Sequence, residues 1–179
     1  MDRTRDLAQG LTRISNKQGK YKTVRVVPTL DTSEYVSGDV LFKPTEIKGA
    51  CLGNGTSVLK QIKMFCLDDE KKDVSLVFFE NEPTVEALNV ASALFTATGG
   101  DNTDALVKAA NPFGAVLLDV NGSNTTVLDY ANLMVYIQGS VDLYVNSVSG
   151  SIYVMGIATG SDTYTAATDL EFDFIFERA

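Results

Sequence analysis

The chain has 179 residues, of which 45% are hydrophobic and 21% are charged, and its formal net charge is -8. This length fits one domain of about 100–200 residues with a tail, and the composition is too apolar for a disordered chain. The acidic charge opposes a sequence-independent grip on nucleic acid phosphates, so we expect no nucleic acid partner for the body of the protein.

Histidine is absent from the chain, and its only cysteines are Cys51 and Cys66. Zinc-ligand spacing is therefore missing, and the common nucleophilic mechanisms lack the imidazole that would serve as their base. The two cysteines could pair, but buried thiols that act as small hydrophobes are the favoured interpretation. We expect no enzymatic activity, no cofactor and no bound metal.

Four acidic residues could in principle supply the paired carboxylates of a glycosidase: Asp142, Asp169, Glu171 and Asp173. Their alternation with apolar residues instead indicates solvated strand faces. The chain has no tryptophan for a sugar platform, but a carbohydrate-binding module could use Tyr130, Tyr136, Tyr144 and Tyr153. Catalysis is disfavoured, and sugar binding stays open as an alternative.

Membrane insertion is not expected, because the longest apolar runs fall far short of the roughly 18 residues of a spanning segment. The chain opens without a signal-peptide pattern, so we expect synthesis in the host cytoplasm. For the same reason the three Asn-x-Ser/Thr matches at 54–56, 121–123 and 124–126 are interpreted as turns.

The first 20 residues are polar and basic, in contrast to the acidic remainder. Apolar side chains at positions 7, 11 and 14 have helical spacing, but so short a helix is marginal until it docks. We expect an extended or partly helical N-terminal arm over residues 1–20 and a β-sandwich domain over residues 21–179. The candidate partner-binding residues of the arm are Arg3, Arg5, Leu7, Leu11, Arg13, Ile14, Lys17 and Lys20.

After the arm, the hydrophobic period becomes that of β-strands. Pro28 suits the end of the first strand, since proline cannot donate to a sheet ladder, and turn sequences separate most of the later segments. The last segment alternates most strictly, with one buried face formed by Leu170, Phe172, Phe174 and Phe176. The expected strands cover residues 23–27, 39–42, 57–67, 74–79, 113–120, 128–138, 141–145, 152–158 and 169–176.

Two of these segments, 57–67 and 74–79, form the clearest predicted hairpin. The charged residues 68–73 between them are expected to be a solvated loop rather than a cation site. A Gln-Gly-Ser turn at 138–140 is expected to separate the strands on either side of it. The structure of residues 84–112 is left open, because 84–98 is rich in helix formers without clean periodicity and 104–110 suggests a short helical turn.

The recurrence of short strands without a βαβ rhythm predicts an all-β fold, an antiparallel sandwich or barrel. Five short sequence segments give further information on the fold: residues 27–32 (VPTLDT), 35–40 (YVSGDV), 55–59 (GTSVL), 76–79 (LVFF) and 164–170 (YTAATDL). Together they resemble the β proteins that decorate tailed-bacteriophage capsids, called decoration or cement proteins. The resemblance covers roughly residues 24–82 and 150–176.

This resemblance implies a jelly-roll-like β-sandwich, present as a homotrimer on the capsid exterior. It also implies a structural virion role, with the major capsid protein lattice as partner. Two alternatives remain open, namely a tail- or fibre-associated virion β domain and a carbohydrate-binding module. The arm departs from the shorter starts typical of decoration proteins.

Overall fold

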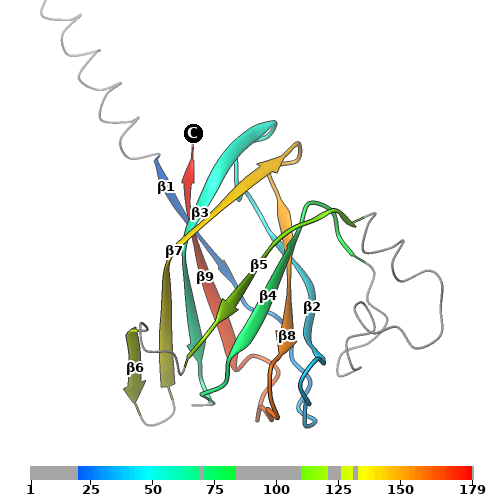
Figure 1. Cartoon of the computed structure of the whole chain (residues 1–179), viewed down its shortest axis with the longest axis vertical. Coiled ribbons are helices and arrows are strands. Elements are labelled where there is room, and N and C mark those ends of the chain that lie inside the picture. Colours follow the sequence, from blue (N-terminus) through cyan, green and yellow to red (C-terminus); the bar gives the residue numbers. More distant parts are fainter. Residues whose placement is uncertain (1–19, 69–70, 84–109, 121–125, 131–132, 179) are drawn as a thin grey trace, which may run out of the picture.

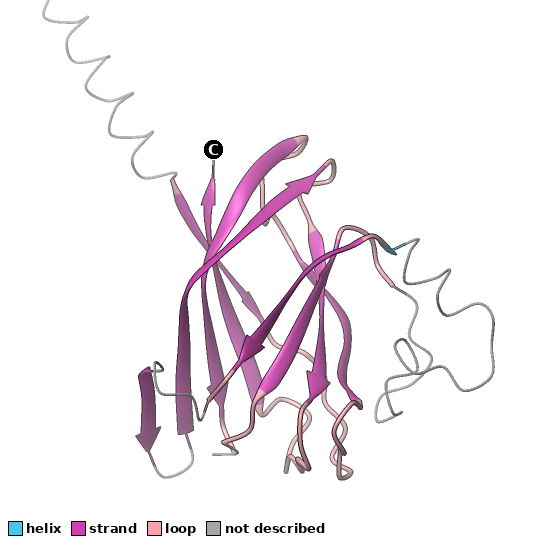
Figure 2. Cartoon of the chain, in the orientation of Figure 1, coloured by secondary structure: helices cyan, strands magenta, loops and turns pink. Residues whose placement is uncertain are grey.

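The computed structural model describes residues 20–68, 71–83, 110–120, 126–130 and 133–178, with the side chains of 126–130 left out. These residues form nine strands in two antiparallel sheets packed face to face (Figures 1 and 2). The predicted all-β sandwich is therefore confirmed. The predicted arm, up to residue 19, and most of the open segment 84–112 lie outside the described residues.

The two sheets have five and four strands among the described residues. Sheet A contains, in spatial order, β1 (Tyr21–Val26), β9 (Leu170–Arg178), β3 (Gly55–Cys66), β7 (Leu133–Ser147) and β6 (Thr126–Tyr130). Sheet B contains, in spatial order, β2 (Val40–Ile47), β8 (Ile152–Ala158), β4 (Val74–Phe79) and β5 (Pro112–Leu118).

The strand order is that of a jelly roll with one added edge strand. When β6 is set aside, the remaining eight strands can be renumbered from 1 to 8 in chain order. The spatial order is then 1-8-3-6 in sheet A and 2-7-4-5 in sheet B. This double Greek-key arrangement defines the jelly roll, so the predicted jelly-roll-like architecture is confirmed by the connectivity itself.

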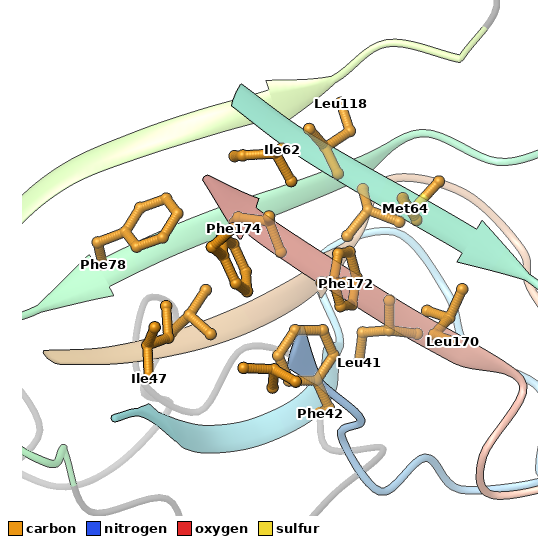
Figure 3. Close-up of a cluster of buried hydrophobic side chains, with 14 of the residues drawn as sticks. Leu41, Phe42, Ile47, Ile62, Met64, Phe78, Leu118, Leu170, Phe172 and Phe174 are labelled. Carbon is orange, nitrogen blue, oxygen red and sulfur yellow. The ribbon is translucent and has the colours of Figure 1, made fainter. Parts of the chain in front are cut away.

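The core lies between the sheets and is rich in phenylalanine (Figure 3). Phe172 of β9 packs against Phe42 of β2, with ring centroids 5.6 Å apart. Phe174 meets Phe78 of β4 edge-on at 5.9 Å. The predicted inward face of the last strand is confirmed, because all four of its members are buried: Leu170, Phe172, Phe174 and Phe176.

Glycine at position 156 makes room for one of these rings. A Cβ atom added to Gly156 in β8 would lie 2.2 Å from Cε1 of Phe42, far inside van der Waals contact. Any larger residue would have to displace a ring that is itself packed against β9. The position of the Phe42 ring over β8 therefore depends on the absence of a side chain at residue 156.

The predicted hairpin between residues 57–67 and 74–79 is wrong. Both segments are strands, but β3 pairs with β7 and β9 in sheet A, whereas β4 pairs with β5 and β8 in sheet B. The connection crosses from one sheet to the other. Alternation in the sequence shows which side of a strand is buried. It is the same for two strands that pair in one sheet and for two strands that face each other across the core.

The predicted turn at residues 138–140 is also wrong. β7 runs through it as one strand from Leu133 to Ser147, with an irregularity where the turn was expected. The predicted strand over 128–138 is divided instead, into β6 and the first part of β7.

Candidate interaction surface

A paired irregularity in β3 and β7 determines which side chains sheet A presents to solvent. Leu59 of β3 is opposite Leu143 of β7, and Gln61 is opposite Gly139, so β7 uses four residues where β3 uses two. The pairing of β3 with β9 is interrupted at the same place. Leu59 and Gln61 are opposite adjacent residues of β9, so Lys60 has no partner position in that strand. Both strands bend together midway along their length (Figure 1). Such bulges re-aim side chains and increase the local twist.

The bulge reverses the inside-outside alternation of β7. Before it, Tyr136 is buried; after it, Val145 is buried and Tyr144 is 79% exposed. An uninterrupted alternation from Tyr136 would have placed Tyr144 on the inner face, because both positions are even-numbered. Two residues of the bulge, Ser140 and Asp142, have positive φ values of 55° and 50°. Left-handed backbone is unfavourable for serine and better tolerated by aspartate, so the exposed tyrosine is held out at a conformational cost that falls mainly on Ser140.

Tyr144 belongs to a line of cross-strand partners on the outer face of sheet A. Tyr21 of β1 is opposite Glu177 of β9, Glu177 is opposite Val58 of β3, and Val58 is opposite Tyr144. Cross-strand partners project from the same face, so these four side chains form one row, here called the tyrosine row. The tyrosines lie at its two ends, and Tyr21 is 58% exposed.

Charged side chains of alternating sign accompany the tyrosine row across the four strands. Lys20, just before β1, has its Nζ 2.6 Å from Oε1 of Glu177 and 5.7 Å from the ring centroid of Tyr21. Lys60 of β3 pairs with Asp142 of β7. These hydrogen-bonded pairs raise the pKa of Lys20 and of Lys60 and lower the pKa of Glu177. Each pair is solvent-exposed, so each contributes little to folding by itself.

A second charged group lies farther along the same face. Arg25 of β1 donates two hydrogen bonds to Asp173, of 2.8 and 2.9 Å, and its NH1 lies 3.2 Å from Glu171. Its guanidinium also lies 5.1 Å from the ring centroid of Phe65. These contacts connect β1, β9 and β3 on the outside of the sheet.

The outer face of sheet A is electrically neutral among the described residues of β1, β9, β3 and β7 and the preceding Lys20. It carries four bases, Lys20, Arg25, Lys60 and Lys63, and four acids, Asp142, Glu171, Asp173 and Glu177. The whole chain has a net charge of -8. The acidic excess therefore lies elsewhere on the molecule.

Part of that excess lies in the loops at the end where β1 finishes. There the carboxylates act as acceptors for backbone N–H groups: Asp31 for Ser33, Asp39 for Val36, Asp68 for Thr165 and Asp73 for Val120. This bonding from Ser33 lowers the pKa of Asp31. These acids have a structural role in holding the loops.

Of the four carboxylates considered for glycosidase chemistry, three are engaged in ion pairs and one caps a turn. Asp142, Glu171 and Asp173 each have a basic partner on the outer face of sheet A. Asp169, expected on a solvated face, is 7% exposed, and that expectation is wrong. Its carboxylate accepts hydrogen bonds from Ala166 N (2.6 Å) and Thr165 Oγ1 (3.1 Å), which caps the turn before β9.

The cysteines and the acidic residues provide no metal cluster in the part of the chain that the structure describes. Cys51 and Cys66 are both buried thiols, as favoured above, and burial raises the pKa of Cys51. Within the same described ranges, no helix is long and apolar enough to cross a membrane.

Of the arm residues predicted to bind a partner, the structure describes only Lys20, which pairs with Glu177. The others, Arg3, Arg5, Leu7, Leu11, Arg13, Ile14 and Lys17, lie outside the described residues. Among the tyrosines considered for sugar binding, Tyr144 is exposed, Tyr136 is buried and Tyr153 is partly buried. The side chain of Tyr130 is not described.

Sequence reasoning did not identify the tyrosine row. Its members come from four strands, and the phase of β7 depends on the bulge. The signal that could have found it is the Gly-Ser-Val-Asp sequence at 139–142, where glycine and small polar residues interrupt a long strand.

Neither a known protein-family model nor a curated protein sequence matches the chain. Chains in several solved virus structures align weakly with this chain. A chain of tomato aspermy virus is 9% identical, covers 95% of this chain and 93% of its own, and has a TM-score of 0.34. A chain of maize chlorotic mottle virus is also 9% identical, with coverages of 90% and 94% and a TM-score of 0.27. For a chain of sacbrood virus of honeybee the identity is 11%, the coverages are 89% and 81%, and the TM-score is 0.28. With scores this low, the fold assignment rests on the strand order.

Proposed function

We propose that this protein is a structural virion protein that decorates and stabilises a tailed-phage capsid by binding the outer surface of the major capsid protein lattice. The observation that carries the proposal is the eight-strand jelly-roll order, found in a chain whose strand and turn phrases resemble decoration proteins. Viral capsid domains are among the principal users of this architecture, although a fold alone does not determine a function.

The chemistry of the chain fits a role in binding rather than catalysis. The sequence has no histidine, Glu171 and Asp173 are engaged in ion pairs, and Asp169 caps a turn. A protein bound in many copies to a repeating lattice gains avidity from multiple weak contacts. We therefore propose a non-enzymatic protein that needs no cofactor, nucleic acid or membrane.

Within this proposal, residues 1–20 form a docking arm and residues 21–179 form the sandwich domain. The arm contributes Arg3, Arg5, Arg13, Lys17 and Lys20, whereas the chain as a whole carries a charge of -8. Opposite charge steers association, so the arm would direct the protein toward an acidic surface on the capsid exterior. The resemblance adds a homotrimeric assembly to the proposal.

Capsid binding can be tested with purified phage shells that lack the protein. The full chain, added in increasing amounts, should bind saturably with hundreds of copies per shell, as measured by cosedimentation and quantitative gel analysis. A few dozen copies or fewer, confined to tailed particles, would instead support the tail- or fibre-associated alternative. Absence of binding to shells and tails would contradict both virion roles.

A carbohydrate-binding module is the second candidate, because two exposed tyrosines, Tyr21 and Tyr144, lie on one sheet face. Stacking of sugar rings on these side chains should shift their resonances in an NMR titration with host-surface oligosaccharides. Shifts confined to these two residues would support sugar binding. Unchanged spectra at millimolar sugar would exclude it for the oligosaccharides used.

A further inference from the structure

We propose that the outer face of sheet A, centred on the tyrosine row, is a two-fold contact between copies of this chain. The inference goes beyond the capsid role, because it concerns the free protein, and the two-fold contact is additional to the homotrimer proposed for the capsid-bound protein. It rests on the bulge that exposes Tyr144, on the neutrality of this face, and on the order of charges along the row.

The first argument is the conformational cost of exposing Tyr144. Two left-handed residues, Ser140 and Asp142, are retained in a bulge whose effect is to place the tyrosine outside at 79% exposure. Backbone strain of this kind persists where the local geometry serves a function. Tyrosine is enriched in protein contacts because it supplies a large amphipathic surface with little conformational freedom to lose.

The second argument is electrostatic. Two copies that each carry a charge of -8 repel one another over most of their surface. The outer face of sheet A avoids this repulsion, since its four bases balance its four acids. A face selected to meet a strongly acidic partner would carry excess positive charge, which this one does not. Neutrality with both signs present is what close approach of a second copy requires.

The third argument is the order of those charges. Across β1, β9, β3 and β7 the sequence is Lys20, Glu177, Lys60 and Asp142, which alternates positive and negative. A two-fold axis that lies in the plane of the contact, parallel to the strands and between β9 and β3, reverses this order in the second copy. Each base then faces an acid, and Tyr21 of one copy faces Tyr144 of the other. Self-complementarity of this kind is the property of an isologous interface.

The available surface is large enough for such a contact. Four strands spaced by about 4.8 Å and a strand length of about 30 Å give a face of roughly 570 Å². Specific stable interfaces bury about 600–1,000 Å² per partner, so the face falls just below that range, among the weaker and transient contacts. The contact is therefore expected to be reversible and concentration-dependent.

The oligomeric state of the full chain tests the proposal. By light scattering after size exclusion, the parent should have twice the molar mass of the Tyr144→Glu variant at the same concentration. Leu117→Glu is the matched control, because Leu117 is 52% exposed on β5 in sheet B and should leave the mass unchanged. Equal masses for the parent and Tyr144→Glu, or a parent that is monomeric at about 100 μM, would overturn the proposal.

Disulfide cross-linking tests the two-fold geometry without disrupting the face. Within one copy, positions 21 and 144 are three strand spacings apart, about 14 Å, which is too far for a disulfide. A mixture of the Tyr21→Cys and Tyr144→Cys variants should therefore cross-link on oxidation, whereas each variant alone should not. Cross-linking as strong in the single variants as in the mixture, or none in the mixture, would overturn the proposed arrangement.

Discussion

At the residue scale, the core depends on single aromatic side chains. Phe174 stacks on Phe172 at 5.9 Å and meets Phe78 edge-on at the same centroid distance. Replacing it with aspartate removes this packing and places a carboxylate between the sheets, at a position without solvent exposure. We expect Phe174→Asp to lower the free energy of unfolding by about 4 kcal/mol or more in urea titrations.

The control for Phe174→Asp is Leu117→Asp, which introduces the same charge at a half-exposed position of β5. Its effect should stay within about 1 kcal/mol, as is usual for surface substitutions. Equal stability of the parent and the Phe174→Asp variant would contradict the inward orientation of the last strand.

Gly156 and Gly139 provide a second matched pair. A methyl group at Gly156 would enter the Phe42 ring, whereas a methyl group at Gly139 would meet no atom within 4 Å. We expect Gly156→Ala to lower the unfolding free energy by about 1–3 kcal/mol through overpacking. Gly139→Ala should change it by about 0.5 kcal/mol or less. Similar urea midpoints for the two variants would show that β2 and β8 can separate at little cost.

Tyr35 links stability to alkaline pH. Its hydroxyl accepts a hydrogen bond from Asp31 N at 2.5 Å, and burial raises the pKa of Tyr35 to about 12. The unfolded chain loses this proton near pH 10, so the folded state binds more protons between pH 10 and 12 and its stability falls over that range. We expect Tyr35→Phe to be less stable than the parent at pH 8, with the difference shrinking as the pH approaches 12. A difference that stays constant up to pH 12 would contradict this linkage.

At the element scale, alternation and apolar runs in the sequence located most of the strands. Residues 152–158 and 74–79 were predicted with the bounds that the structure shows, and the inward side of β9 was identified correctly. Pairing was not predictable in the same way. A strand with one buried face has the same sequence pattern whether the next strand in the chain pairs with it or lies across the core. For this reason β3 and β4 were wrongly predicted to form a hairpin.

The bulge shows a second limit of local reasoning. Gln138, Gly139 and Ser140 have turn composition, and a turn would have ended the strand. The pairing of β3 with β7 on both sides of the interruption instead keeps the strand continuous and confines the irregularity to a few residues. Tyr144 could be noted as an aromatic from the sequence, but its exposure follows from this long-range pairing.

Substitutions at Ser140 test whether the bulge is strained. Its φ of 55° suits glycine and disfavours β-branched residues. Ser140→Val should therefore lower the unfolding free energy by about 1–2 kcal/mol, whereas Ser140→Gly should be neutral or slightly stabilising. Valine favours ordinary strands, so a stabilised Ser140→Val variant in urea denaturation would indicate that the left-handed conformation is absent.

At the scale of the whole molecule, charge is distributed unevenly. Acidic turn caps occupy the loop end where β1 finishes, the outer face of sheet A is neutral, and the basic arm leaves from the opposite end of β1. The sequence revealed the basic arm directly, because it is contiguous. It could not reveal the neutral face, whose members are brought together by strand pairing between residues more than 100 positions apart.

The arm leaves the sandwich at Lys20, which marks where a deletion should end. Lys20 belongs to the folded body, since its carbonyl accepts a hydrogen bond from Arg178 N at 2.7 Å and its Nζ pairs with Glu177. Deleting residues 1–19 therefore removes the basic arm without removing these contacts. We expect the melting temperature of the free protein to change little, because β1 keeps its pairing with β9 from Tyr21 onward.

The same deletion should weaken attachment to capsids, and the loss should resemble that caused by raising salt, because both remove the attraction between the arm and an acidic surface. The matched control keeps the length of the arm and neutralises its charge through Arg3→Gln, Arg5→Gln, Arg13→Gln and Lys17→Gln. Weakened binding in both variants would assign docking to charge, whereas weakening only in the deletion would assign it to Leu7, Leu11 and Ile14. A deletion variant that fails to fold would place residues 1–19 in the core, and one that binds shells as tightly as the full chain would remove the arm from the docking surface.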